Sequence, residues 1–366
     1  MGPTSYLEVR KVQRRHVLTT TLIVALAVFA FGSAAAAAEN EAGRELRLYN
    51  WEEYVDPQVV ADFEAEFGID VIVETFSDEN EMVSAIQADT SRYDMFITSD
   101  GVIYEMAEQR LLSELDLGNI PNLANVDPRF LDLQSDPGNR YSVPYDWGTT
   151  GITYDTDCVE PAKESWGLLL DPSIAGRVAM DADFDVALSS MLKFLGYPLN
   201  SSDPAQVAEA TGVLADMTID QGLQLLTWDE MLDRLASGEL CAGQTFNGDA
   251  ATYLEENDQL AFFVPREGSD FYVDSMAITR DAPNKLGAEL FINYMLRPEV
   301  HARNNDFTGY AVPNRASIEG GYVSAESLAD PVRYPDTERL ESWDAFDEDR
   351  WTLWNKAWSD FVTTTG

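Results

Sequence analysis

Four short segments bring aromatic rings next to carboxylates or into a turn, and these residue types suit the recognition of an organic cation. They are Asn50-Trp51-Glu52-Glu53-Tyr54, Phe246-Asn247-Gly248-Asp249, Phe271-Tyr272-Val273-Asp274-Ser275 and Gly309-Tyr310. Ring faces attract a cation by about 0.5–2 kcal/mol each, and a carboxylate adds charge-assisted hydrogen bonds of about 1.5–3 kcal/mol each. The pattern therefore indicates binding of an organic ammonium. Core aromatics beside solvated acids are the alternative interpretation.

Other chemistries find little support in the sequence. The chain has no G-x-x-x-x-G-K-[ST] or G-x-G-x-x-G motif, and His301 is the one histidine after residue 38. The run Asp181–Asp185 begins like a calcium loop, but Val186 and Leu192 occupy the positions that require Gly and Glu. We therefore expect no metal, no cofactor and no catalytic residue. A secreted carboxylate hydrolase remains a weaker alternative, because so many acids produce pairs by chance.

The elements that would position these side chains alternate between strands and helices. Residues 45–50 alternate like a strand, Asp56-Pro57 opens a helix that Gly68 ends, and further elements follow at 69–73 (strand), 79–88 (helix) and 94–98 (strand). This alternation predicts a mainly parallel sheet with helices on both faces. Ligands of such sheets lie beyond the carboxyl ends of the strands, where Asn50-Trp51 and Ser99-Asp100 fall.

A second region repeats the pattern between residues 150 and 272. We expect strands at 151–154, 178–180 and 240–246, an apolar helix at 286–296 that Arg297-Pro298 ends, and a final helix at 351–361. Trp351, Trp354, Trp358 and Phe361 share one face of that last helix, which predicts docking on its own lobe rather than a ligand platform.

The N-terminus has the pattern of an export signal. Residues 1–38 combine a basic segment with an apolar run at 17–31 and an alanine run, and we expect cleavage after Ala38. Arg14-Arg15 leaves both the Sec and the twin-arginine route open, and an uncleaved anchor is the alternative to cleavage. In an oxidising compartment, Cys158 and Cys241 form one disulfide or remain two thiols.

The net charge is strongly negative. The chain has 24 Lys and Arg against 64 Asp and Glu, a net charge of −40, and removal of residues 1–38 leaves 20 against 63. Such a chain repels nucleic-acid backbones, so nucleic acid is excluded as a partner. The acids far outnumber the requirements of any ligand, which indicates a saline habitat.

Six motifs together resemble those of the periplasmic spermidine/putrescine-binding proteins of ABC transporters. They are Leu48–Tyr54, Ser142–Gly148, Asn247-Gly248, Pro265–Gly268, Asp274–Ile278 and Leu296–Val300. The resemblance spans nearly the whole chain after the export signal. It implies an α/β fold of two lobes that close over a linear polyamine, with the first lobe at 43–148 plus 273–318 and the second at 149–272 plus 319–366.

The resemblance also implies which residues bind the ligand. They are Trp51, Tyr54, Ser99, Asp185, Phe246, Asp249, Tyr272, Asp274, Tyr310 and Asp344. Phe246 and Tyr272 keep a ring at positions where relatives often have Trp, and Gly101 replaces a Tyr of spermidine-type relatives. Asp249 is typical of putrescine-preferring relatives. We therefore expect putrescine to be favoured over spermidine.

The expected function is capture of a polyamine in the periplasm and its delivery to an inner-membrane ABC permease. No reaction is involved, and we expect a monomer that is not embedded in the membrane. A protein of the same fold for another organic cation, such as a basic amino acid or a betaine, is the nearest alternative. An amino-acid site would need an arginine for the α-carboxylate. None of the motifs above places one in the predicted cleft, because we expect Arg266 and Arg297 to lie in peripheral turns.

Overall fold

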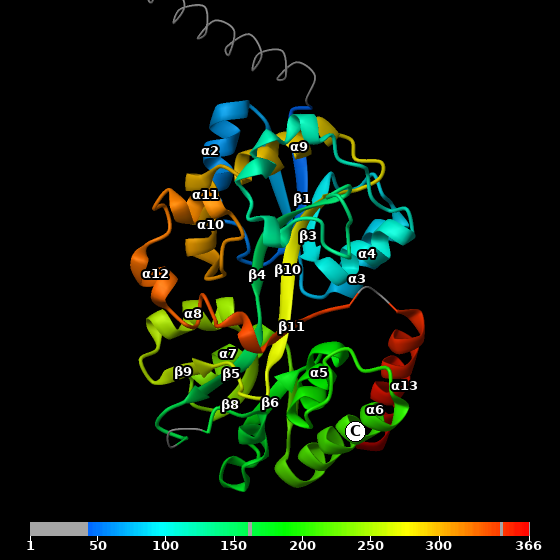
Figure 1. Cartoon of the computed structure of the whole chain (residues 1–366), viewed down its shortest axis with the longest axis vertical. Coiled ribbons are helices and arrows are strands. Elements are labelled where there is room, and N and C mark those ends of the chain that lie inside the picture. Colours follow the sequence, from blue (N-terminus) through cyan, green and yellow to red (C-terminus); the bar gives the residue numbers. More distant parts are fainter. Residues whose placement is uncertain (1–42, 160–162, 345–346, 366) are drawn as a thin grey trace, which may run out of the picture.

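The protein consists of two lobes stacked along its long axis, each with a central β-sheet flanked by helices (Figure 1). The structure is a computed structural model that describes residues 43–159, 163–344 and 347–365. The export signal expected at 1–38 lies outside the described residues. Among the described residues, no helix combines the length and apolar character that a membrane span requires.

The first lobe is built around a six-stranded mixed sheet that extends into the connection between the lobes, where residues 269–271 pair with residues 340–342. The strands β1 and β2 are parallel, as are β1 and β3, whereas β10 runs antiparallel to both β3 and β4. The bounds are β1 (Glu45–Trp51), β2 (Asp70–Phe76), β3 (Met95–Ser99), β4 (Ser142–Gly148), β10 (Ser269–Ile278) and β11 (Leu340–Ser342).

Helices cover both faces of this sheet because each one buries an apolar stripe against it. One face packs on α2 and α9 through Phe63 and Phe291, and the other packs on α3 and α4 through Met82 and Ile103. The bounds are α2 (Pro57–Phe67), α3 (Glu79–Ala88), α4 (Asp100–Glu108), α9 (Lys285–Met295), α10 (Pro298–Thr308) and α11 (Arg315–Glu319).

The second lobe has a five-stranded sheet in the order β7-β6-β8-β5-β9. Its strands are β5 (Thr150–Asp155), β6 (Val178–Asp181), β7 (Gln224–Leu226), β8 (Ala242–Phe246) and β9 (Leu260–Phe263). Its helices are α5 (Phe184–Phe194), α6 (Pro204–Asp216), α7 (Trp228–Ala236), α8 (Asn247–Glu256) and, at the end of the chain, α13 (Glu348–Thr365). The short α12 (Ala325–Ala329) borders the same hollow as α10 of the first lobe. Short helical turns complete the chain: η1 (Leu117–Asn119), η2 (Pro121–Asn125), η3 (Pro128–Phe130), η4 (Trp166–Leu170), η5 (Pro172–Ile174), η6 (Met217–Gln221) and η7 (Thr337–Arg339).

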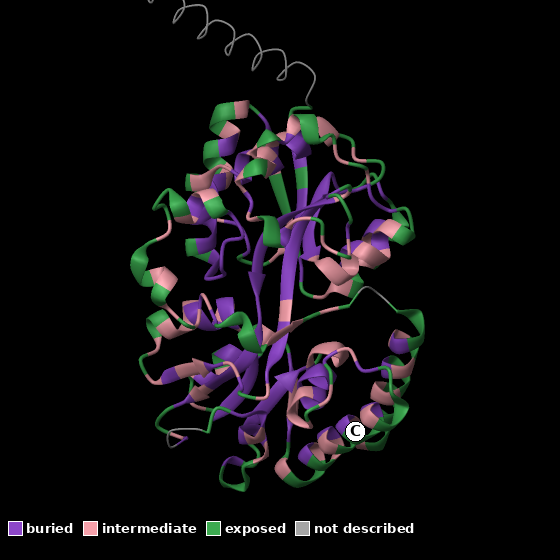
Figure 2. Cartoon of the chain, viewed as in Figure 1, coloured by how far each residue is buried: buried purple, intermediate pink, exposed green. Residues whose placement is uncertain are grey.

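Two strand segments run between the lobes. β4 continues into β5 with only Thr149 between them, and the ten-residue β10 pairs with β11 at one end and with β3 and β4 at the other. Figure 1 shows β10 in yellow along the long axis, and Figure 2 shows that it is buried over most of its length. The antiparallel pairs of both sheets all involve β5 or β10.

The local predictions from the sequence agree well with these elements. Asp56 caps α2 by accepting a hydrogen bond from the Gln58 amide at 2.8 Å, and Gly68 ends this helix with φ 67°. The helix expected at 79–88 is α3. The apolar helix expected at 286–296 is α9, and Pro298 starts α10.

The C-terminal helix α13 docks on the second lobe, as its aromatic face predicts. Trp354 and Phe361 are buried in the core that also contains α5 and α6, and the Trp354 indole donates to the Ser201 carbonyl at 2.9 Å. The Trp351 ring contacts Phe184 with centroids 4.7 Å apart.

A disulfide joins Cys158, just after β5, to Cys241, just before β8, with their Cα atoms 5.6 Å apart. Of the two states that the sequence left open, the structure has the bonded one. The bond closes a loop with a sequence separation of 83 residues.

The disulfide yields the first prediction. Alkylation of the native protein without reductant should label no thiol by mass spectrometry. Reduction should lower the free energy of unfolding by roughly 2–4 kcal/mol, because release of a long loop increases the entropy of the unfolded chain. The double variant Cys158→Ser/Cys241→Ser serves as the control and should not respond to reductant. Two alkylated thiols in the native protein would contradict the bond.

Candidate functional site

A tyrosine hydroxyl lies between two buried carboxylates on the strands that run between the lobes. Asp146 in β4 and Asp274 in β10 stand directly opposite each other in the antiparallel pair. The Tyr54 Oη lies 2.9 Å from Asp146 Oδ1 and 2.7 Å from Asp274 Oδ2. The exposed fraction is 0% for Asp146 and 8% for Asp274. We call these two acids the central pair.

The environment of the central pair opposes its negative charge. Burial, and after it the charge of Asp274, raises the pKa of Asp146 well above its ordinary value. Burial raises the pKa of Asp274 to about 7, with the hydrogen bond from Tyr54 opposing and the charges of Glu79 and Asp100 adding to the shift. A buried carboxylate without a countercharge is unfavourable, so the pair favours a bound proton or a bound cation.

A second acid lies on the other lobe behind a group of aromatic rings. Asp249 belongs to the first turn of α8, and Tyr310 Oη donates to its Oδ2 at 2.8 Å. Burial raises the pKa of Asp249 to about 7. The Tyr310 ring lies 5.6 Å from that of Tyr54, which joins this acid to the central pair. Tyr272 and Phe246 continue the rings, with centroids 5.9 Å apart.

A third set of acids lies at the N-termini of three helices. Glu79 and Asp100 begin α3 and α4 in the first lobe, and Asp183 and Asp185 lie at the start of α5 in the second. Burial raises the pKa of Asp100 and of Asp185 to about 7 and that of Asp183 to about 6, and the charge of Glu79 adds to all three shifts. Acids of the two lobes therefore face each other here.

Two further predicted residues lie at strand ends in the first lobe. Ser99 stands opposite Asp274 in the β3–β10 pair, and its backbone amide donates to Glu79 Oε1 at 3.1 Å. Trp51 ends β1, half-buried, and its ring packs on Phe76 with centroids 4.4 Å apart.

The structure places Asp344 apart from these acids. Its side chain is 67% exposed, its carboxylate lies 3.8 Å from Arg350, and its backbone amide donates to the Asn200 side chain at 3.0 Å. The other predicted residues with acid or hydroxyl groups come together, namely Tyr54, Ser99, Asp185, Asp249, Tyr272, Asp274 and Tyr310.

Sequence reasoning did not select Asp146, Glu79, Asp100 or Asp183. For Asp146 a partial signal existed in the sequence, because Tyr145 and Trp147 flank it and so repeat the pattern of rings beside a carboxylate. The three others follow strand ends as helix-starting acids, a pattern that this acidic chain repeats at many places.

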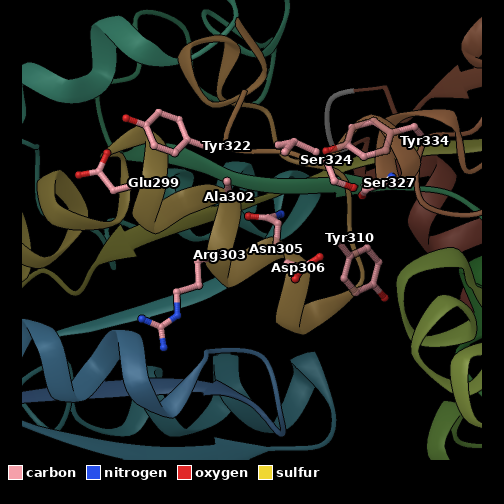
Figure 3. Close-up of a pocket in the computed structure, with 11 residues that line it drawn as sticks. Glu299, Ala302, Arg303, Asn305, Asp306, Tyr310, Tyr322, Ser324, Ser327 and Tyr334 are labelled. Atoms are coloured by element: carbon pink, nitrogen blue, oxygen red, sulfur yellow. Dashed lines mark hydrogen bonds between the residues drawn. The ribbon is translucent and has the colours of Figure 1, made fainter. Parts of the chain in front are cut away.

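The described part of the chain contains no group of three or more His, Cys, Asp or Glu side chains placed to hold a metal ion. A hollow of about 270 Å³ lies beside α10 (Figure 3). The Tyr310 ring borders this hollow, whereas its hydroxyl points away from it toward the side of α8, where Asp249 accepts its hydrogen bond.

Comparison with known proteins identifies the family. The model of the bacterial extracellular solute-binding proteins matches residues 58–332. The chain belongs to this family. Its members and the curated relatives are solute-binding transport proteins rather than enzymes.

The relatives of this solute-binding protein include polyamine-binding proteins. The spermidine/putrescine-binding periplasmic protein of Escherichia coli is 31% identical over 322 residues, covering 87% of this chain and 91% of the relative. A putrescine/agmatine-binding protein of Pseudomonas aeruginosa is 30% identical and covers 78% and 83%. Among solved structures, the spermidine/putrescine ABC transporter substrate-binding protein of Streptococcus pneumoniae has a TM-score of 0.77 at 33% identity, covering 88% and 100%. The resemblance seen in the sequence is thereby confirmed.

We predict that the ligand-free protein loses stability as the pH rises from about 5 to about 7, and that the loss levels off at higher pH. Asp249 and Asp274 ionise near pH 7 in the folded protein and near 3.8 when exposed. The folded state therefore binds more protons in between, and linkage makes the free energy of unfolding fall with pH. His301, whose pKa burial lowers to about 4, gives the opposite slope only below its ordinary 6.5.

Denaturant unfolding at three pH values within this window measures the slope. The Asp249→Asn variant should have a shallower slope, because one carboxyl no longer titrates. A flat or rising stability in the parent protein would contradict the prediction.

A further prediction concerns the close approach of Tyr310 to α8. A Cβ atom at Gly248 would lie 2.4 Å from atoms of the Tyr310 ring. Gly248→Ala should therefore lower the free energy of unfolding by about 1–3 kcal/mol through overpacking. Gly212→Ala in α6, where a Cβ meets nothing within 4 Å, should instead stabilise by about 0.5–1 kcal/mol. Equal effects of both variants in denaturant unfolding would show that the ring has room to move.

Proposed function

We propose that this protein captures a linear polyamine outside the cytoplasmic membrane and delivers it to an inner-membrane ABC permease. The observation that supports this most is a series of carboxylates along the interface between the lobes: the half-buried Asp249, then the buried central pair, then the half-buried Asp185 and Asp100. Their raised pKa values result from burial and from other acids. A chain of ammonium groups would supply the countercharges that these acids lack.

The surrounding side chains suit the methylene segments of such a ligand. Tyr54, Tyr272 and Tyr310 are nearly buried and offer ring faces between the acids. Rings of this kind pack on aliphatic chain and also attract the ammonium ends. Because the site is buried, salt screens these interactions much less than those of the surface acids.

A binding site for an amino acid has less support. Such a ligand requires a cation for its carboxylate, usually a bidentate arginine. The two arginines of the family motifs are engaged elsewhere: Arg297 forms hydrogen bonds to Glu66 at 2.7 Å, and the Arg266 side chain is 61% exposed.

For the preferred polyamine, the export route, the oligomeric state and the lobe bounds, we propose what the sequence predicts. Putrescine binds more tightly than spermidine, because Asp249 is present and Gly101 leaves open space around its Cα. The protein reaches the periplasm by means of a cleaved signal at 1–38 and acts as a monomer in a salty environment. The lobes are divided at 148/149, 272/273 and 318/319.

In the proposed transport cycle, the ligand bridges the two lobes. Asp274 belongs to the first lobe and Asp249 to the second, so a diammonium that contacts both favours the closed form over the open one. β4–β5 and β10 are the connections about which the lobes rotate. The permease then recognises the closed form.

Titration calorimetry tests the function directly. Putrescine and spermidine should each produce heat, with the lower Kd for putrescine, and native mass spectrometry of the purified protein should detect a bound polyamine. Absence of heat and of a thermal shift with both compounds at millimolar concentration would refute the proposal. Detection of bound arginine or betaine would assign the site to another organic cation.

Two alanine variants test the map of the site. Asp274→Ala should weaken binding by at least about 30-fold, because a buried charge-assisted contact is worth about 2 kcal/mol or more. Asp344→Ala removes an equal charge from an exposed position and should change Kd by less than about 2-fold. Equal losses would show that the map is wrong.

A further inference from the structure

The central pair is a like-charged pair at directly opposite positions of two neighbouring strands. Side chains at such positions have Cβ atoms about 4.5–5.5 Å apart, and like charges there are destabilising. Asp146 and Asp274 occupy such positions in β4 and β10. Since both are almost completely buried, solvent does little to reduce their repulsion.

Without a ligand, the hydrogen bonds to the central pair leave some of its carboxylate oxygens without a donor. The Tyr54 hydroxyl carries one hydrogen, so it donates to one of the two carboxylates at a time. Asp146 Oδ2 is buried and has no hydrogen-bond partner within the described residues. An unpartnered buried carboxylate oxygen costs more than any other polar atom left in this way. A donor is therefore missing at this oxygen.

Among the residues that the structure describes, the groups that act on the pair provide no countercharge. The titratable groups that act on it are acids and tyrosines from every neighbouring element: Tyr54 after β1, Tyr145 in β4, Tyr272 in β10, Tyr310 after α10, Asp249 in α8, and Glu79 and Asp100 at the starts of α3 and α4. His301 contacts the Tyr145 carbonyl and is held neutral by burial, which lowers its pKa to about 4. Only a proton or a ligand can compensate the second charge.

We propose that Asp146 and Asp274 together hold one ammonium group of the ligand, and that this ammonium replaces a proton which the empty pair shares. The inference rests on the proposed function and adds Asp146 to the ligand-binding residues. An ammonium donates one N–H to each carboxylate and thereby supplies the donor that Asp146 Oδ2 lacks. The displaced proton passes to the solvent.

Calorimetry in buffers with different enthalpies of ionisation measures the proton. Putrescine is the probe, at about pH 7, and the dependence of the observed heat on the buffer gives the number of protons released per ligand. The parent protein should release at least about one proton, and Asp146→Asn about one fewer. Asp146→Asn should also weaken binding about 30-fold at pH 8, where both carboxylates are needed, and clearly less at pH 6.

The control is Asp306→Asn. Asp306 lies in the hollow on the outer side of Tyr310 (Figure 3), and its side chain is 80% exposed. The Asp306→Asn variant removes the same charge and should change neither the affinity for putrescine nor the number of protons released on binding. If Asp146→Asn binds putrescine as the parent does at every pH, Asp146 remains protonated in the complex and the proposal is wrong.

Infrared difference spectroscopy of the parent protein gives an answer that does not depend on how well a variant folds. Addition of putrescine should remove a protonated-carboxyl band, and Asp146→Asn should reduce that change by the share of the central pair, because Asp249 and the acids at the helix starts still titrate. Binding of putrescine without loss of such a band would overturn the inference and leave the proposed function intact. Absence of any polyamine binding would instead refute the proposed function.

Discussion

The repulsion between Asp146 and Asp274 is the constraint on which the rest of the site depends. The two acids face each other across β4 and β10, the strands that run from one lobe to the other. A position that is buried, acidic and without a countercharge is a poor choice for stability alone. The pair lies on the two strands that connect the lobes. In the proposed transport cycle, a cation that neutralises the pair would therefore act directly on the segments about which the lobes rotate.

Local structure was predictable from the sequence to a large extent, whereas the pairing of distant segments was not. The cap at Asp56, the Pro after it and Gly68 act within one helix, so their meaning does not depend on the rest of the chain. The expected mainly parallel sheets are in fact mixed, because β5 and β10 enter their sheets from the other lobe. Asp146 was not selected as a site residue because only the register of β4 on β10 places it opposite Asp274.

The acids of this chain fall into two physical classes. Most are exposed and keep the surface hydrated, and in about 1 M salt, where the Debye length is about 3 Å, they contribute little to attracting a ligand. A small buried or half-buried minority at the lobe interface has raised pKa values, such as about 7 for Asp185 and Asp249. The net charge of −40 is set mainly by the exposed acids and gives almost no information about the few at the lobe interface. The candidate site was therefore found from aromatic residues adjacent to acids in the sequence and not from the overall charge.

The short connection between β4 and β5 affects the order in which parts of the proposed site would contact the ligand. With only Thr149 between two paired strands, the pivot is short. Asp146 lies three positions before Thr149 in β4, and Asp274 stands opposite Asp146 in β10. Atoms near a pivot move little when the arms swing, so in the proposed transport cycle Asp146 and Asp274 would keep their geometry when the lobes open. The Tyr310–Asp249 contact and the facing helix starts at Glu79 and Asp183 lie on the swinging arms and separate. A ligand would thus anchor first at the fixed point, and the arms would enclose it afterwards.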